Sequence, residues 1–331
     1  ARRLKARRTV LSSRDGREAL EQAVQPDTDL TVAAISGIAG LRPLMHAIKN
    51  SKAVAIANKE PLVAAGALVK AAAVEYDTQI LPIDSEHNAV FQVFNPAQRA
   101  GIRRIILTAS GGPFRTWSLD EIKKATPEQA VAHPNWDMGA KISVDSASMM
   151  NKALEVIEAH VLFDMPAEQI DVLIHPQSVV HSMVEYADGS ILAQMGASDM
   201  RTPIAYALAW PGRMNTPGQR LDLAKMAGLN FETPDWERFP ALRLAYECLQ
   251  KGPMACLTLN AANEVAVAAF LAGKITFPDI LCTIKFALGQ EPDISLDTID
   301  SVEKADGIVR ARVSTYIKDE LSPSMMKVKA V

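Results

Sequence analysis

Three apolar runs separated by helical stretches constrain how this chain can begin to fold. Residues 30–35 predict a buried strand, and 52–57 and 78–83 predict two more, with a helical stretch between each pair. Strand, helix, strand, helix, strand is the pattern of a parallel sheet with crossover helices. The carboxyl ends of such strands meet at one edge of the sheet, where ligands gather.

Polar residues follow each of these three runs directly, so we expect them to lie close together. They are Ser36 with Gly37, Asn58 with Lys59 and Glu60, and Asp84 with Ser85 and Glu86.

The rest of the chain predicts a mixed architecture. Four further strands are expected at 104–108, 172–174, 179–186 and 190–195, with helices at 119–130 and 147–163 and a loop at 133–139. The expected fold class is α/β, with a partial doubly wound (Rossmann-like) parallel sheet, an α+β catalytic domain and a C-terminal helical bundle. The expected boundaries are an incomplete nucleotide-binding domain at 1–84, a catalytic domain at 85–210, a linker at 211–239 and a helical domain at 240–331.

Composition excludes several classes of protein. With 331 residues, 48% of them hydrophobic, the chain can bury a large core. A net charge of −3 provides no general field for nucleic acid or an anionic membrane. The three cysteines form no C-x-x-C pair, so neither a disulfide framework nor a zinc site is indicated. Charges interrupt every apolar stretch before about 18 residues, so no membrane span is expected.

The basic start, residues 1–8, has three interpretations. It could be a nucleic-acid arm, the remains of a transit peptide, or an exposed helix that begins within a domain. We favour the third interpretation, which predicts a protein lacking its front end.

Carboxylates predict a metal site. Asp84 and Glu86 are two apart after a strand, and extended backbone would project both to one side. Oxygen ligands of this kind suit Mg²⁺ or Mn²⁺. Glu155, on a predicted helix edge, is the candidate third ligand. The alternative is that the first two acids are solvated or cap a turn.

Serines and a lysine predict a phosphate site. Ser146 would lie at the start of the 147–163 helix, where free N–H groups favour anions. Asn151 and Lys152 follow on that helix, and Ser110 lies in a glycine-flanked turn. Singly, each could instead be an N-cap, a surface residue or a turn residue.

The segment 133–139 predicts a lid, because it places Trp136 and Met138 between a proline and a glycine. A loop anchored on the core by Trp136 is the alternative. Nearby, His175 favours a structural role, and His181 stays open between a site and a structural role.

Six strings resemble the 1-deoxy-D-xylulose-5-phosphate reductoisomerase family. They are ANKEP (57–61), PIDSEHNAVFQ (82–92), ILTASGGPF (106–114), HPNWDMGAKISVDSASMMNKALEVIEA (133–159), HPQSVVHSMVEYADGSILAQMG (175–196) and DMRTPIAYALAWP (199–211).

The resemblance implies a role for each matching position. The divalent metal, Mn²⁺, Mg²⁺ or Co²⁺, would be held by Asp84, Glu86 and Glu155. The sugar-phosphate substrate would be bound by Glu86 and Glu155 with Ser85, Ser110, His133, Trp136, Met138, Ser146, Asn151 and Lys152. Catalysis would involve Lys59, Asp84, Glu86, Lys152 and Glu155, and NADPH would meet Asn58, Lys59, Glu60 and Gly139.

The implied reaction is a rearrangement followed by a reduction. A carbon–carbon bond would be cleaved and rejoined, and hydride from NADPH would trap the aldehyde as 2-C-methyl-D-erythritol 4-phosphate, an isoprenoid precursor of the non-mevalonate pathway. The resemblance also implies a homodimer, with no nucleic-acid or membrane partner. The implied location is the cytoplasm, or a plastid if the source is eukaryotic.

One departure leaves rival functions open. The family opens with a glycine-rich turn, whereas this sequence has no G-x-G-x-x-G fingerprint. One rival is a metal-dependent sugar-phosphate isomerase or aldolase without the hydride step. The other is a binding protein without catalysis. The complete set of metal and phosphate candidates argues against the second rival.

Overall fold

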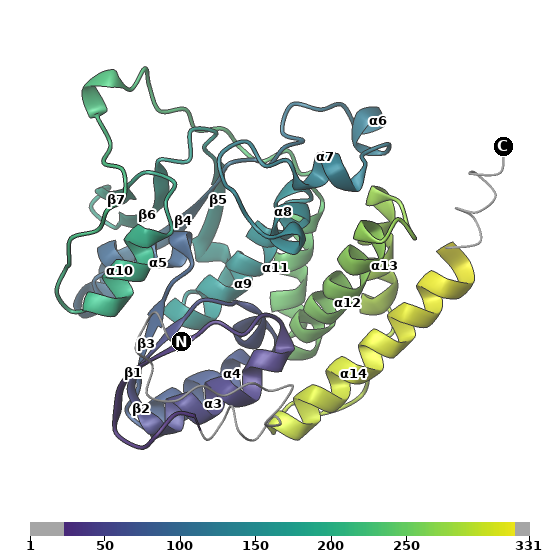
Figure 1. Cartoon of the computed structure of the whole chain (residues 1–331), viewed down its shortest axis with the longest axis horizontal. Coiled ribbons are helices and arrows are strands. Elements are labelled where there is room, and N and C mark those ends of the chain that lie inside the picture. Colours follow the sequence, from purple (N-terminus) through teal and green to yellow (C-terminus); the bar gives the residue numbers. More distant parts are fainter. Residues whose placement is uncertain (1–22, 322–331) are drawn as a thin grey trace.

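The structure is a computed structural model, and it describes residues 23–321. The basic segment 1–8 lies outside the described residues. Within them the chain folds into two sheets, with long helices packed between and beside them (Figure 1).

The first sheet is parallel, as the sequence predicts, in the order β1-β2-β3. Its strands are β1 (Thr28–Ala33), β2 (Ser51–Ile56) and β3 (Gln79–Pro82). Two crossover helices connect them, α3 (Leu41–Asn50) and α4 (Glu60–Glu75). The central strand β2 is apolar and largely buried, with Val54 paired to Thr31 on one side and Ile80 on the other. The polar clusters therefore emerge together at one edge.

The second sheet is mixed, in the order β5-β4-β6-β7. Its strands are β4 (Ile102–Ala109), β5 (Ile170–Ile174), β6 (Val180–Tyr186) and β7 (Ile191–Met195). β4 runs parallel to β5 and antiparallel to β6. Helices α5 (Ser85–Val93) and α10 (Arg201–Ala209) lie beside this sheet (Figure 1).

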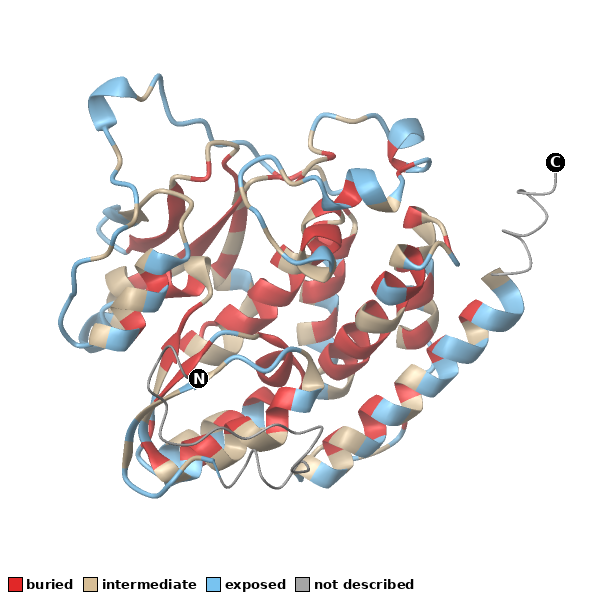
Figure 2. Cartoon of the chain, viewed as in Figure 1, coloured by how far each residue is buried: buried red, intermediate tan, exposed pale blue. Residues whose placement is uncertain are grey.

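Long helices complete the fold. They are α9 (Met150–Phe163), α11 (Ala241–Lys251), α12 (Pro253–Leu271), α13 (Phe277–Leu288) and α14 (Ile299–Tyr316). Short helical turns are η2 (Ile38–Gly40), η3 (Pro96–Gly101), η4 (Ala167–Gln169), η5 (Leu223–Lys225) and η6 (Ile317–Leu321). One cluster of buried side chains runs from α3 through α9 and α12 to α14 (Figure 2). The expected domain boundaries stay a prediction, because this one core contains residues from each of the expected domains.

One predicted helix was wrong in its continuity, and another in where it begins. The 119–130 stretch forms two short helices, α6 (Leu119–Ile122) and α7 (Pro127–Val131), each opened by its own capping box. The helix predicted at 147–163 is α9, which begins at Met150 instead of 147. The preceding helix α8 (Ala140–Ala147) was not predicted, and Met149 between the two has a left-handed backbone with φ of 61°. A left-handed residue cannot continue an α-helix, so the chain turns there.

Helix α12 is largely apolar, although the charge of Glu264 interrupts it. This helix is long and apolar enough to cross a membrane by length and composition, yet 67% of that stretch is buried inside the fold. Burial of this extent is what a core helix shows.

Candidate active site

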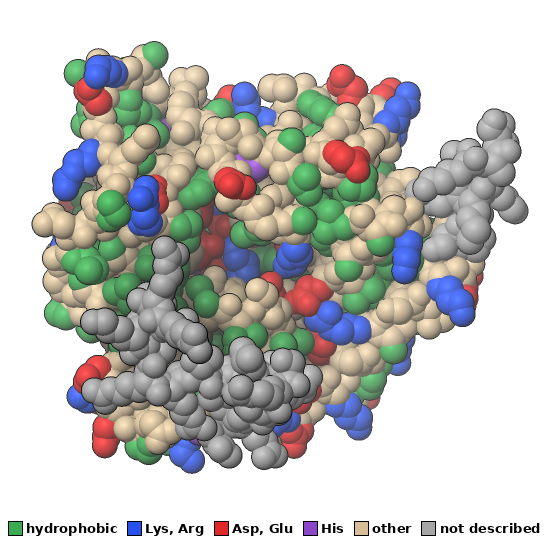
Figure 3. All heavy atoms as spheres, in the orientation of Figure 1, with side chains coloured by type: hydrophobic (Ala, Val, Ile, Leu, Met, Phe, Trp, Pro, Cys, Tyr) green, Lys and Arg blue, Asp and Glu red, His purple; other side chains and the backbone are tan. Residues whose placement is uncertain are grey.

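A cavity of about 820 Å³ opens where the two sheets meet α8 and α9. Residues following β2, β3 and β4 all line it, including Lys59, Asp84 and Ser110. Acidic and basic side chains gather at the hollow near the centre of the face shown in Figure 3. The strand-end clusters predicted from the sequence thus converge on one cavity.

Three carboxylates form one acidic group in the lining of the cavity. One oxygen from each of Asp84, Glu86 and Glu155 lies within 4.8 Å of the others. The reasoning from extended backbone was wrong, because Asp84 is the N-cap of α5 and accepts from the backbone N–H groups of Glu86 and His87. Glu86 therefore projects from the first turn of a helix. Glu155 approaches from α9 with no exposed surface.

Two buried lysines neutralise these carboxylates. Lys59 Nζ donates to Asp84 Oδ2 at 2.8 Å, to Asn151 Oδ1 at 3.0 Å and to Glu155 Oε1 at 3.3 Å. Lys152 forms an ion pair with Glu155 and lies 3.5 Å from Glu86 Oε1. Lys59 thus contacts two predicted metal ligands, Asp84 and Glu155, and it also lies beside the cofactor candidates Asn58 and Glu60 in the sequence.

The local charges fit a divalent cation. Burial alone would raise the pKa of Asp84, but Lys59 and His87 hold it well below its usual range. Burial raises the pKa of Glu86 to about 7; Lys152 opposes this shift, and the charges of Glu155 and Asp84 add to it. Burial makes the negative charge of Glu86 costly, and a divalent cation such as Mg²⁺ or Mn²⁺ would offset that cost.

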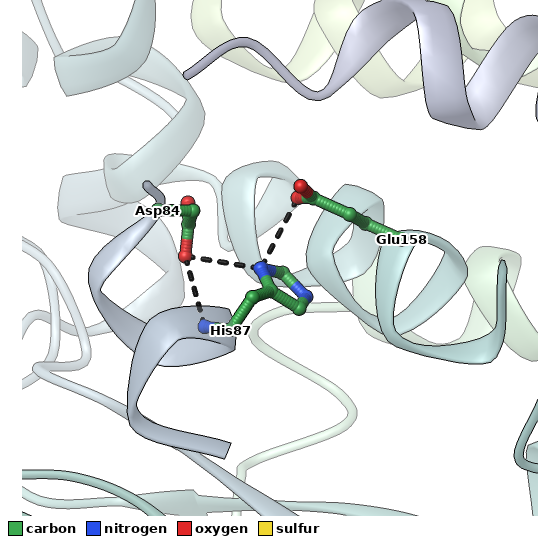
Figure 4. A group of neighbouring side chains, drawn as sticks. All are labelled: Asp84, His87 and Glu158. Atoms are coloured by element: carbon green, nitrogen blue, oxygen red, sulfur yellow. Dashed lines mark hydrogen bonds and ion pairs between the residues drawn. The ribbon is translucent and has the colours of Figure 1, made fainter. Parts of the chain in front are cut away.

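Behind the three carboxylates lies a pair that sequence reasoning missed, His87 and Glu158 (Figure 4). His87 Nδ1 lies 3.1 Å from Asp84 Oδ1 and 3.2 Å from Glu158 Oε2, and Nε2 lies 2.9 Å from the backbone oxygen of Glu155. Burial would lower the pKa of His87, but Glu158 and Asp84 raise it to about 9. The charged imidazolium therefore holds two ligand-bearing segments together. Two sequence signals could have indicated this pair: His87 directly follows the Asp84-Ser85-Glu86 string, and Glu158 lies three residues after Glu155 on the same helix.

Two of the four predicted phosphate donors, Ser110 and Ser146, line the cavity outside the carboxylate group, whereas Asn151 and Lys152 lie within it. Ser110 Oγ lies 3.0 Å from His133 Nε2 and accepts from the backbone N–H of Gly112 at 3.1 Å. Ser146 lines the same cavity, but its predicted place at a helix start was wrong. Ser146 lies in the last turn of α8. It can therefore offer a phosphate its hydroxyl group, but not the free N–H groups of a helix amino terminus.

Segment 133–139 covers this end of the cavity as an irregular loop, as predicted. Asn135 Nδ2 donates to Pro176 O at 2.8 Å and to Ser178 Oγ at 3.0 Å. The indole of Trp136 lies 6.1 Å from the ring of His181. Met138 lines the cavity beside them. These contacts hold the loop over the cavity, and a role for Asn135 was missed.

The tautomer of His133 follows from its donors. Its Nδ1 accepts from the backbone N–H groups of Asn135, at 3.2 Å, and Trp136, at 3.0 Å. A neutral ring then carries its proton on Nε2 and donates it to Ser110 Oγ. Burial lowers the pKa of His133, which favours this neutral form.

We therefore expect acid to open the loop 133–139. Because the pKa of His133 is lower in the closed loop than the ordinary 6.5, closing is fully favoured above pH 6.5 and weakens as the pH falls below it. Protonation of Nδ1 removes the acceptor for Asn135 and Trp136. At each lower pH, the rate of chymotrypsin cleavage after Trp136 is compared between the unaltered chain and the His133→Gln variant. The ratio of the two rates should rise as the pH falls. Equal acceleration in that variant would contradict the role of His133.

Of the remaining candidate residues, some line the cavity and one, His175, does not. Asn58, Glu60 and Gly139 line the cavity on the side of α4 and α8, and Glu60 pairs with Lys141. His175 is structural, as favoured: its Nδ1 lies 2.8 Å from Asn230 O, and its ring stacks on Phe231. His181 lines the cavity.

Three family models match most of the chain. Residues 1–66 match 1-deoxy-D-xylulose 5-phosphate reductoisomerase, 80–163 match its C-terminal domain, and 195–312 match DXP reductoisomerase C-terminal domain. The reductoisomerase of Rhodospirillum centenum is 56% identical over 93% of this chain and 77% of that protein. That of Zymomonas mobilis is 53% identical over 92% and 78%.

Solved structures agree. The reductoisomerase from Zymomonas mobilis in complex with NADPH gives a TM-score of 0.86 at 51% identity, covering 92% of this chain and 79% of that one. A DOX-P reductoisomerase in complex with NADPH, fosmidomycin and magnesium gives 0.88 at 44% identity, covering 91% and 79%. The chain belongs to the 1-deoxy-D-xylulose 5-phosphate reductoisomerase family.

Proposed function

We propose that this chain converts 1-deoxy-D-xylulose 5-phosphate to 2-C-methyl-D-erythritol 4-phosphate, using NADPH and a divalent metal. The observation that carries the proposal is that three carboxylates, Asp84, Glu86 and Glu155, share one cavity with the serines of a phosphate site. Family membership and the NADPH and magnesium complexes of similar structures support it.

The chain's residues divide the work by position. A divalent cation at the carboxylates would supply Lewis-acid polarisation, and NADPH would supply hydride. Ser110, Ser146 and His133 would bind the phosphate, and this remote binding orients the reacting carbons. Lys152, buried beside Glu86 and Glu155, would hold a substrate hydroxyl near the metal ligands. The closed loop 133–139 would exclude water.

One assay separates this function from its rivals. The chain is incubated with 1-deoxy-D-xylulose 5-phosphate, Mg²⁺ and NADPH, while NADPH oxidation and the sugar products are followed. Both metal-dependent NADPH oxidation and the methylerythritol product are expected. Loss of the substrate without NADPH oxidation would favour an isomerase or aldolase. Binding of fosmidomycin without turnover would favour a binding protein.

We further propose that the chain works in the cytoplasm and forms a homodimer. The interface of this dimer would be the edge of β7. Within the described residues β7 pairs only with β6, and Ile191 and Leu192 on it are 51% and 49% exposed. Exposed Ile204 and Leu208 lie on α10. An open apolar strand edge is suited to pairing with a second copy.

Leu192→Lys should produce a monomer, because a lysine on an edge strand blocks strand pairing. Light scattering after gel filtration at micromolar concentration measures the mass. The control is Val74→Lys, since Val74 is 81% exposed on α4, away from this edge. A dimer that survives Leu192→Lys would place the interface elsewhere.

A further inference from the structure

Lys141 bridges two carboxylates that belong to different helices, Glu60 on α4 and Asp145 on α8. Its Nζ lies 3.2 Å from Glu60 Oε1 and 2.9 Å from Asp145 Oδ2. The side chain of Lys141 is 34% exposed, whereas those of Glu60 and Asp145 are 10% and 2% exposed. Ion pairs with partners this well buried are screened far less than surface pairs.

Each carboxylate is attached to a different binding element. Glu60 is the first residue of α4, beside Asn58 and Lys59 at the proposed cofactor end. Asp145 directly precedes Ser146 at the proposed phosphate end, and its Oδ1 accepts from Asn263 Nδ2 of α12 at 2.8 Å. Lys141 is thus an ionic connection between the two ends.

Lys141 also lies close to the end of the loop 133–139. Helix α8 begins at Ala140, with Gly139 as its N-cap, and the backbone oxygen of Gly139 accepts from Ser143 at 3.1 Å. One end of α8 therefore carries the loop, and its last turn carries Ser146. A shift of α8 would move both.

The charges keep this bridge ionised. Burial would lower the pKa of Lys141, but Asp145 and Glu60 raise it well above its usual value. Burial would likewise raise the pKa of Glu60, but Lys141 holds it below its usual value. One ammonium therefore serves two carboxylates, and a ligand that engages Glu60 changes how strongly Lys141 holds Asp145.

We propose that Lys141 is a positioning residue that holds α8 against α4 and thereby couples cofactor binding to binding at the phosphate end. The inference rests on the proposed function, in which NADPH and the sugar phosphate share the cavity. Two sites coupled through a shared element must tighten each other reciprocally. Lys141 itself touches neither reacting group in this account.

Calorimetric titration of the 331-residue chain tests the coupling. NADPH affinity is measured with and without fosmidomycin and Mg²⁺, and the ratio of the two dissociation constants is the coupling factor. Factors of about 5 to 150 are usual for coupled sites. Lys141→Met should bring the factor close to one. Lys141→Arg keeps a cation that can reach both carboxylates and should retain most of the coupling.

The matched control is Lys123→Met, since Lys123 also pairs with a carboxylate, Asp120 at 2.9 Å, but on the exposed surface of α6. It should leave the factor unchanged. Partial unfolding alone would raise the factor, because the first ligand would restore the folded state that the second one binds, whereas loss of the bridge should lower it. A wild-type factor in Lys141→Met would overturn the inference.

Hydrogen exchange of the ligand-free chain separates this inference from the proposed function. Faster exchange across residues 140–147 in Lys141→Met, about tenfold, is expected if the bridge holds α8. If the wild-type chain binds neither ligand, the proposed function fails. If hydrogen exchange across residues 140–147 is the same in Lys141→Met as in the wild type, the anchoring of α8 by Lys141 is overturned.

Discussion

Glu155→Gln is expected to abolish turnover while the chain remains folded. The glutamate is fully buried and contacts Lys59 and Lys152, and it supplies the third oxygen of the proposed metal site. Loss of an outer-shell partner already costs metal affinity about 10- to 100-fold, so loss of a direct ligand should cost at least about 100-fold. Mg²⁺ titration of activity and of fosmidomycin binding measures the effect.

The fold should persist because glutamine has the same shape and the lysines retain other partners. Lys59 keeps Asp84 at 2.8 Å, and Lys152 keeps Glu86 at 3.5 Å. The control is Glu168→Gln, an exposed glutamate in η4 that should keep full activity. Circular dichroism verifies folding of both variants. Wild-type turnover in Glu155→Gln would remove this residue from the metal site.

Gly112→Ala is expected to have the second largest effect, on substrate binding. Gly112 has a φ of 67°, and an added Cβ would lie 2.5 Å from the backbone oxygen of Ser146. Neither atom can retreat without moving backbone, so the turn carrying Ser110 must separate from the end of α8. Splitting these two phosphate donors should raise the KM for the sugar phosphate about tenfold or more, since each tenfold corresponds to about 1.4 kcal/mol.

Gly189→Ala separates steric overlap from backbone strain. Gly189 has a φ of 85°, but a Cβ there would meet no atom within 4 Å. Both variants carry the left-handed strain of roughly 1–2 kcal/mol, whereas only Gly112→Ala carries the overlap. We expect a lowered Tm in both and a raised KM in Gly112→Ala alone. Equal KM values in the two variants would show that the contact between turn and α8 does not shape the phosphate site.

Much of the fold could be predicted because its signals are local. The buried strands at β1, β2 and β3 are short apolar runs, and the polar residues at their ends are adjacent in sequence. Parallel pairing then places those ends together without further information. Asp84 and Glu86 were identified as ligand candidates in this way, although the backbone that presents them is helical.

The helix break at Met149 could not be predicted, because the sequence around it contains neither glycine nor proline. The buried side chain of Met149 packs into the core, and this packing selects a backbone that local propensity disfavours. Contacts between distant residues were equally hidden. The hydrogen bond from Asn263 to Asp145 spans 118 positions, and no local pattern indicates it.

The break has a consequence for how such chains can vary. In one continuous helix Ser146 and Asn151, five residues apart, would point about 140° away from each other. With the left-handed residue between them, both line the same cavity. An insertion or deletion between them would rotate one of the two away, whatever residues were chosen. The length of this segment therefore matters more to the shape of the site than the identity of its intervening residues does.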